Sequence, residues 1–163
     1  MNQEAVALIK RQGFFRHSVD LPTSIQDLVL ARNWSELDRA IGAEVQSGGV
    51  LFRTLRKFAE FSQIEFIISI RSSLVEPDED GIWHDDGSRV LAFSLSLTLD
   101  PASISGGLLE IRHRGKLNSE SAIQLPTPEF GTMIIFATGY QGFEHKINAV
   151  REGERIIIAG WCT

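Results

Sequence analysis

Residues 89–99 read Arg-Val-Leu-Ala-Phe-Ser-Leu-Ser-Leu-Thr-Leu, and from Phe93 onward apolar and small polar side chains alternate without interruption. Successive side chains of a β-strand point to opposite faces, so this stretch predicts a strand with one apolar and one polar face. The apolar face can pack against helices, whereas the face that carries Ser94, Ser96 and Thr98 suits water or a ligand. A barrel lined in this way encloses a pocket rather than a filled core.

Further strands are expected on both sides of this stretch, and the N-terminal part of the chain has a different pattern. Residues 1–62 carry apolar side chains at helical spacing, which predicts a series of helices. Many short strands separated by turn-forming clusters predict a β-sandwich or barrel. The strand candidates are residues 64–71, 107–112, 131–137, 143–150 and 155–161.

The composition describes an ordinary globular protein of 163 residues, which we expect to form a single domain over residues 1–163. Within it, residues 1–62 would form a helical buttress for a β core at residues 63–163. Acidic residues outnumber basic ones by 21 to 16, and the net charge of −5 disfavours nucleic-acid binding. No apolar stretch approaches the roughly 20 residues of a membrane helix. With a single cysteine, Cys162, and no visible secretory signal, we expect a cytoplasmic protein.

His84 and Asp86 form an H-x-D motif just before the alternating strand. On extended backbone, residues two apart point to the same side, so this imidazole and this carboxylate can bind one metal ion. A second histidine from a distant strand would complete a triad of two histidines and one carboxylate, which is typical of non-haem Fe(II) oxygenases. Zinc accepts the same ligands, and the alternative without a metal is a solvated histidine beside an acidic loop.

The segment from Phe143 to Trp161 reads as a β-hairpin whose arms carry His145 and Arg155. If Ala149 pairs with Arg155, a five-residue turn remains and both functional side chains share a face. Arg155 would then lie about 13 Å along the strand from His145, a gap that a five-carbon dicarboxylate and an arginine side chain can bridge. Because guanidinium groups bind carboxylates through paired hydrogen bonds, we expect Arg155 to hold such a ligand; the alternative is a surface arginine at a turn.

Four stretches of the C-terminal two thirds together resemble the Fe(II)/2-oxoglutarate-dependent dioxygenases, specifically their prolyl 4-hydroxylase-like branch. The specific features are the H-x-D motif, a histidine about sixty residues further on, a basic residue ten positions later and a tryptophan six positions after that. The stretches are WHDDGSRV (83–90), GGLLEI (106–111), PEFGTMIIF (128–136) and FEHKINAVREGERIIIAGW (143–161).

This resemblance implies a mainly β, α+β protein built on a double-stranded β-helix, a jelly-roll or cupin-like barrel. It identifies His84, Asp86 and His145 as ligands of Fe(II), and Arg155 as the residue that binds the C5 carboxylate of the cosubstrate 2-oxoglutarate. Ser96 stands where relatives often carry a tyrosine that touches 2-oxoglutarate, and it can form a hydrogen bond over a shorter reach.

The activity implied by the resemblance is hydroxylation of an unactivated C–H bond, with O2 consumed and succinate and CO2 released. The implied substrates are a peptidyl proline, an amino acid or another small metabolite, and ascorbate is the expected reductant. The alternative function is that of a non-catalytic ligand-binding or regulatory protein on the same barrel. A cupin-type zinc or manganese isomerase would usually show an H-x-H motif and a glutamate ligand, which we do not find.

Overall fold

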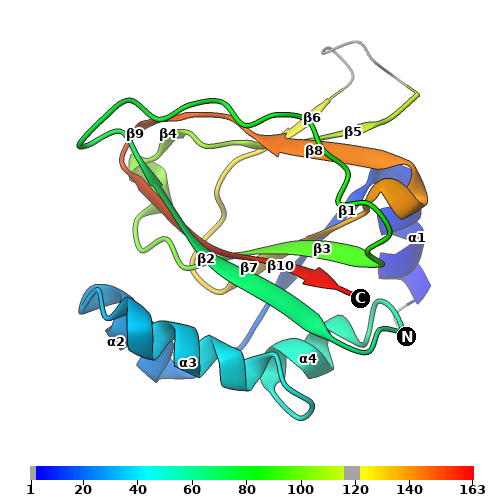
Figure 1. Cartoon of the computed structure of the whole chain (residues 1–163), viewed down its shortest axis with the longest axis horizontal. Coiled ribbons are helices and arrows are strands. Elements are labelled where there is room, and N and C mark those ends of the chain that lie inside the picture. Colours follow the sequence, from blue (N-terminus) through cyan, green and yellow to red (C-terminus); the bar gives the residue numbers. More distant parts are fainter. Residues whose placement is uncertain (1–2, 116–121) are drawn as a thin grey trace.

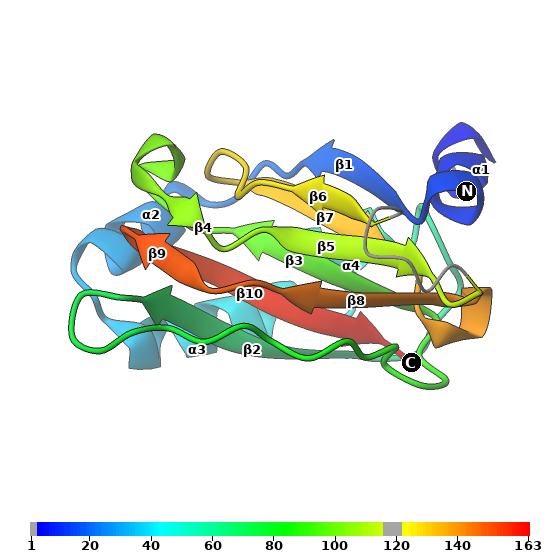
Figure 2. The ribbon, with the colours of Figure 1, turned by 90° about the horizontal axis from the view of Figure 1, so that it is seen from above.

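The larger of two facing antiparallel sheets runs through the middle of the molecule in the computed structural model, which describes residues 3–115 and 122–163 (Figure 1). Its strands, in spatial order, are β1 (Phe14–Ser18), β7 (Thr132–Phe136), β3 (Leu91–Ser96), β10 (Glu154–Cys162) and β2 (Ile64–Ser72). The smaller sheet lies above it and contains β6 (Ile123–Leu125), β5 (Leu109–His113) and β8 (Phe143–Ile147). Figure 2 shows the strands of this second sheet overlying those of the first. A short pair, β4 (Ser105–Gly106) and β9 (Val150–Glu152), lies at one end.

The helices that follow β1 in the chain cover the face of the large sheet that points away from the small one, whereas the N-terminal helix lies at one end of the molecule (Figure 1). Asn33 begins one of them by accepting a hydrogen bond from the backbone N–H of Glu36 at 3.3 Å, as expected for an N-cap residue. No helix within residues 3–115 and 122–163 has the length and apolar character needed to cross a bilayer. The helices are α1 (Gln3–Gln12), α2 (Thr23–Leu30), α3 (Trp34–Glu44) and α4 (Val50–Leu55).

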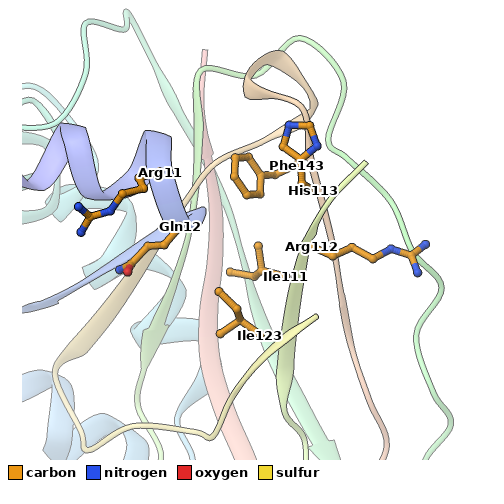
Figure 3. A pocket seen from close by; sticks show the side chains of 7 residues that line it. All are labelled: Arg11, Gln12, Ile111, Arg112, His113, Ile123 and Phe143. Atoms are coloured by element: carbon orange, nitrogen blue, oxygen red, sulfur yellow. The ribbon is translucent and has the colours of Figure 1, made fainter. Parts of the chain in front are cut away.

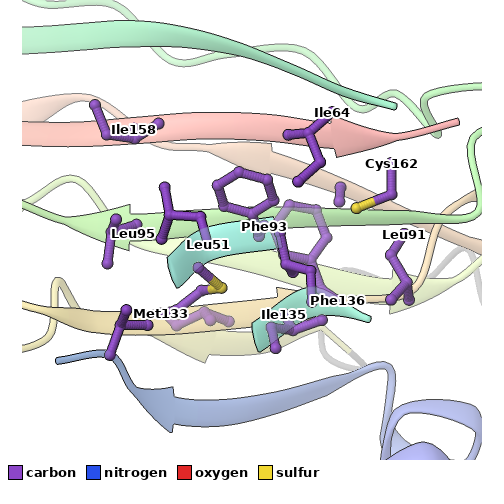
Figure 4. Packing of buried hydrophobic residues seen from close by; sticks show 14 of the residues in the cluster. Leu51, Ile64, Leu91, Phe93, Leu95, Met133, Ile135, Phe136, Ile158 and Cys162 are labelled. Atoms are coloured by element: carbon purple, nitrogen blue, oxygen red, sulfur yellow. The ribbon is translucent and has the colours of Figure 1, made fainter. Parts of the chain in front are cut away.

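The alternation predicted from residues 89–99 is confirmed in β3, whose two faces have different surroundings. Phe93 and Leu95 are buried and pack beside Leu51 of α4 on the helix-covered face (Figure 4). Each such side chain contributes about 1.5–3 kcal/mol through the apolar surface it removes from water. The intervening Ser94 points to the opposite face, toward the small sheet. The apolar half of the pattern therefore holds the sheet to the helices, and the polar half is left for the interior of the barrel.

The predicted hairpin between residues 143 and 161 is wrong. β8 pairs with β5, with His145 opposite Ile111, whereas β10 pairs with β2 and β3. Arg155 lies opposite Arg71 rather than Ala149, because the chain passes from the small sheet to the large one through β9. A period of two fixes the face that a side chain occupies but not the strand that lies beside it, so the pattern alone could not exclude this crossover.

One part of the N-terminal segment also departs from the prediction. Residues 1–62 were expected to be helical, but Phe14–Ser18 form strand β1, which pairs with β7 at the edge of the large sheet. The five residues are too few to show a period of their own, and their strand conformation is stabilised by hydrogen bonding to β7.

Candidate functional site

Two histidines that are far apart in the sequence meet at an isolated antiparallel bridge. The backbone N–H of His84 donates to the carbonyl of His145 at 3.0 Å, and the N–H of His145 donates to the carbonyl of His84 at 2.8 Å. Their ring centroids are 4.3 Å apart. The bridge is the local reason that one residue from the loop after β2 and one from β8 face the same space.

Asp86 completes this cluster from two residues further along the loop. Its φ of 57° places it in the left-handed region, which aspartate tolerates better than most residues. Its Oδ2 lies 3.3 Å from Nε2 of His145, and its Oδ1 lies 3.7 Å from Nε2 of His84. One potential ligand atom from each of the three residues falls within 4.8 Å of the other two. The structure therefore brings His84, Asp86 and His145 together.

The protonation of this cluster fits a divalent cation. Nδ1 of His84 lies 2.9 Å from the carbonyl oxygen of Ile82 and donates a hydrogen bond to it, which leaves Nε2 as the nitrogen directed at the cluster. Burial, together with the nearby charge of His84, lowers the pKa of His145 to about 3 and keeps its imidazole neutral near pH 7. Oδ2 of Asp86 and Nδ1 of His145 are buried and have no hydrogen-bond partner within the described residues. Two imidazoles and one carboxylate are a ligand set for Fe(II) or zinc.

A cavity of about 190 Å³ lies between the two sheets beside this cluster. Ser94 and Ala159 line it from the large sheet, whereas His145 and Leu109 line it from the small one. The ring of Phe136 lies 4.6 Å from that of His145 and narrows the space around the imidazole. The remaining lining residues are Ile67, His84, Phe93, Ile147, Ile157, Gly160 and Trp161.

Arg155 is a second polar group buried on this side of the large sheet. It is 2% exposed, its Nη2 lies 3.5 Å from Oγ of the cavity residue Ser94, and its Nε and Nη1 have no partner within the described residues. Burial, and secondarily the charge of Arg71, lowers the pKa of Arg155 to about 10, which still leaves it cationic near pH 7. A buried guanidinium without an acidic contact is costly, so the arrangement fits a ligand that brings its own carboxylate.

Two neighbouring residues explain why Asp78 does not pair with Arg155 and why the arginine side chain fits in its place. Asp78, the acid that acts on it electrostatically, instead forms an ion pair with Arg71, with 3.0 Å between Nε and Oδ2. Gly107 has a φ of +63°, and a Cβ added to it would lie only 3.0 Å from Cδ of Arg155 and from Cγ2 of Val150. A glycine at this position therefore provides the space that the arginine side chain occupies.

Ser96, the other residue expected to contact a cosubstrate, lies away from the lining of the cavity. It is fully buried, and its Oγ accepts a hydrogen bond from the backbone N–H of Thr98 at 3.3 Å. The serine that lines the cavity is Ser94, which the sequence reasoning did not single out. Ser94 lies opposite Ala159, whose small side chain leaves space, whereas Ser96 lies opposite the larger Ile157.

A second cavity, of about 280 Å³, lies between α1 and the small sheet (Figure 3). Its apolar wall includes Ile111 and Phe143, and Arg11 and Gln12 line it from the helix. None of the three clustered residues lines it, so it is separate from the space beside His145.

Comparisons with known proteins give one family match and several similar folds. The family model described as the 2OG-Fe(II) oxygenase superfamily matches residues 74–163. A prolyl-4-hydroxylase from Pseudomonas putida is 17% identical, with a TM-score of 0.66 over 99% of this chain and 94% of that one. HygX from Streptomyces hygroscopicus, solved with nickel and 2-oxoglutarate, is 9% identical, with a TM-score of 0.62 over 99% of this chain and 86% of its own.

A third solved structure is a prolyl hydroxylase from Trichoplax adhaerens in complex with a peptide of hypoxia inducible factor. It is 12% identical, with a TM-score of 0.59 over 97% of this chain and 86% of that one. No curated protein sequence matches the chain significantly. Likeness at these identities is a likeness of fold, and it confirms the predicted mainly β architecture with N-terminal helices, a double-stranded β-helix.

Proposed function

The chain belongs to the 2OG-Fe(II) oxygenase superfamily, and from this premise we propose that it hydroxylates an unactivated C–H bond while 2-oxoglutarate is converted to succinate and CO2. His84, Asp86 and His145 are the proposed ligands of Fe(II), and Arg155 is the proposed partner of the C5 carboxylate of 2-oxoglutarate. The observation that carries this proposal is a His-Asp-His cluster beside the cavity, in which Oδ2 of Asp86 and Nδ1 of His145 have no hydrogen-bond partner in the described residues. Behind the cavity wall lies the buried guanidinium of Arg155, 3.5 Å from Oγ of the cavity residue Ser94.

When bound, Fe(II) and 2-oxoglutarate would supply the oxidising chemistry together with O2, and ascorbate would serve as the reductant. The residues of this chain hold and orient these groups. His145 needs no deprotonation before it binds a cation, because burial keeps its pKa near 3. Asp86 supplies one negative charge, so part of the charge of a divalent ion is left for an anionic cosubstrate. Leu109, Ile147 and Phe136 are the apolar walls that exclude water around the bound groups.

We propose that the substrate inserts into the cavity only the group that carries the reacting C–H bond. At about 190 Å³, the cavity is smaller than pockets that enclose a drug-sized molecule, and the cosubstrate would occupy part of it. A side chain such as a peptidyl proline, or the end of an amino acid or small metabolite, fits this restriction. The relative from Trichoplax adhaerens, solved with a peptide, supports the first of these substrate classes.

The direct test is succinate release by the purified chain loaded with Fe(II) under anaerobic conditions and then exposed to O2 and 2-oxoglutarate. We expect slow release without substrate, faster release with the correct substrate, and none with His145→Ala. Prolyl peptides, free amino acids and small metabolites would be screened for stimulation. A loaded protein that neither binds 2-oxoglutarate nor releases succinate would contradict the proposal and support a non-catalytic binding protein.

A further inference from the structure

We propose that Trp83 is a positioning residue for His84: its indole ring, held on the outer face of the small sheet by Arg112 and Lys146, fixes the direction from which His84 enters the metal site. This inference rests on the proposed function, because it takes His84 as a metal ligand. The contacts that carry it lie outside the cavity and involve none of the three proposed ligands directly.

Apart from the ring of His145, whose centroid lies 4.3 Å away, little in its own surroundings holds the side chain of His84 in place. Its side chain is 49% exposed, and the hydrogen bond found for its ring within the described residues is the one between Nδ1 and the carbonyl of Ile82. The residue belongs to no named strand, and the isolated bridge to His145 fixes its backbone but not its χ angles. By contrast, the ring of His145 is buried and contacts Phe136.

Strand alternation links the direction of His84 to that of Trp83. Neighbouring side chains on extended backbone point to opposite faces, so a tryptophan held on the outer face turns the following histidine inward. The antiparallel bridge between His84 and His145 places Trp83 opposite Lys146, and Nζ of Lys146 lies 5.4 Å from the centroid of the indole ring. Cζ of Arg112, on the adjacent strand β5, lies 3.9 Å from the ring. Figure 3 shows Arg112 extending away from the side of Ile111 and Phe143.

The two cations that hold the ring are themselves fixed by ion pairs. Nε of Arg112 donates to Oε1 of Glu144 at 2.5 Å, and Nζ of Lys146 lies 3.3 Å from Oε2 of Glu110. Glu144 and Lys146 flank His145 in β8, so one strand carries both the platform for Trp83 and a proposed metal ligand. A guanidinium stacked on tryptophan is the favoured form of a cation–π contact, and this one is partly shielded from water. The platform thus couples the loop that carries His84 to the strand that carries His145.

The first test compares metal binding by Trp83→Ala and Trp83→Phe, with anaerobic Co(II) as the probe. We expect about tenfold weaker binding for Trp83→Ala and an altered Co(II) visible spectrum, whereas Trp83→Phe, which keeps an aromatic face, stays within about threefold of the wild type. Trp34→Ala is the matched control, because Trp34 also stacks with an arginine, Arg32 at 5.2 Å, but begins helix α3 away from the site. Thermal unfolding of the metal-free proteins checks that each variant folds; Trp83→Leu replaces Trp83→Ala if that variant does not.

A double-mutant cycle with His84→Ala identifies the residue through which Trp83 acts. If Trp83 positions His84, Trp83→Ala has no further effect on Co(II) affinity once His84 is absent. An equal loss in both backgrounds would overturn the proposal, as would wild-type affinity in folded Trp83→Ala or Trp83→Leu. If His84→Ala itself leaves the affinity unchanged, the proposed ligand set fails, and the positioning role fails with it. That outcome is distinguishable from a failure of Trp83 alone, in which His84→Ala weakens binding and Trp83→Ala does not.

Discussion

The two faces of the large sheet differ in how completely their buried atoms are satisfied. The helix-covered face is apolar, and Phe93 and Leu95 are packed there with almost no exposure. On the cavity side, four of the six buried side-chain atoms found without a hydrogen bond in the described residues belong to Asp86, His145 and Arg155. A buried polar atom without a partner costs about 1–3 kcal/mol. The comparison indicates that one face stabilises the fold, whereas the other retains a cost that a bound ligand would offset.

The largest effect is expected from Asp86→Asn, which removes the charge of a proposed metal ligand with little change in shape. Asparagine tolerates the left-handed backbone at this position, so the loop is preserved. We expect succinate release to fall to background while the metal-free protein unfolds at the same temperature or higher, because an unpaired carboxylate oxygen is no longer buried. Marked destabilisation of the metal-free variant would show that the cavity face also supports the fold.

The opposite pattern is expected from Leu95→Ala on the helix-covered face, at a residue that does not line the cavity. Leu95 is fully buried beside Leu51 of α4, so its truncation leaves an empty space in the apolar core (Figure 4). The substitution should lower the free energy of unfolding by about 3–5 kcal/mol, measured by urea titration. At low temperature, the remaining folded molecules should bind 2-oxoglutarate with nearly wild-type affinity. If the variant instead lost 2-oxoglutarate binding with an unchanged free energy of unfolding, the result would contradict the difference inferred between the two faces.

Arg155→Met should lower the affinity for 2-oxoglutarate by about 100-fold, because the loss of a buried charge-assisted contact typically costs 2–5 kcal/mol. The same change should stabilise the metal-free protein by roughly 1–3 kcal/mol, since methionine fills similar space without an unpaired charge. Calorimetric titration and thermal unfolding measure the two effects. Arg155→Lys serves as the control: it keeps the charge but loses the paired geometry, so an intermediate affinity is expected.

A smaller effect, about 2 kcal/mol at pH 7, is expected from Asp78→Asn, which weakens the contacts of the loop before His84. Burial acts to raise the pKa of Asp78, but hydrogen bonds from the N–H of Val150 and from Arg71 outweigh it and hold the pKa below its usual value of 3.8. The stability from this carboxylate is therefore present above pH 3.8 and is lost as the pH falls through the lower folded pKa. Urea titrations from pH 7 down to pH 2 should show the wild type and the variant converging.

The smallest effect is expected at Cys162, which is buried on the helix-covered face. Burial raises the pKa of its thiol to about 12, so the reactive thiolate is scarce at pH 8. A thiol reagent should leave the native protein unmodified for hours and label it rapidly in urea. Rapid labelling of the native protein would indicate that this face opens far more often than its packing implies.

The sequence was sufficient to predict features that depend on local periodicity. The faces of Phe93 and Ser94 follow from a period of two, which every strand shares. Which serine reaches the cavity is a different matter, because it depends on the residue opposite: Ala159 beside Ser94, and Ile157 beside Ser96. That register is set by the packing of the whole sheet, and no local pattern encodes it.

In the proposed site, too, local spacing predicts some features, whereas others depend on how distant segments pack together. The spacing of His84 and Asp86 predicted that the two side chains would lie together, and the structure places them so, although Asp86 does this through a left-handed turn and not through extended backbone. The direction of Arg155 was inferred from a hairpin that does not exist, since β8 and β10 lie in different sheets. The role proposed for Trp83 depends on Arg112, which lies on the distant strand β5, and so could not be inferred from the sequence around His84 and Asp86 alone.

The bridge between His84 and His145 has a consequence for the order of events during biosynthesis. A ribosome must add the sixty-one residues from 85 to 145 before the two imidazoles can meet, so a growing chain has no complete site with which to capture an ion. If these residues bind the proposed ion, the complete site forms only after the chain has folded. Because the apolar packing against the helices involves none of the proposed ligands, we expect the metal-free chain to fold first and to bind the ion afterwards.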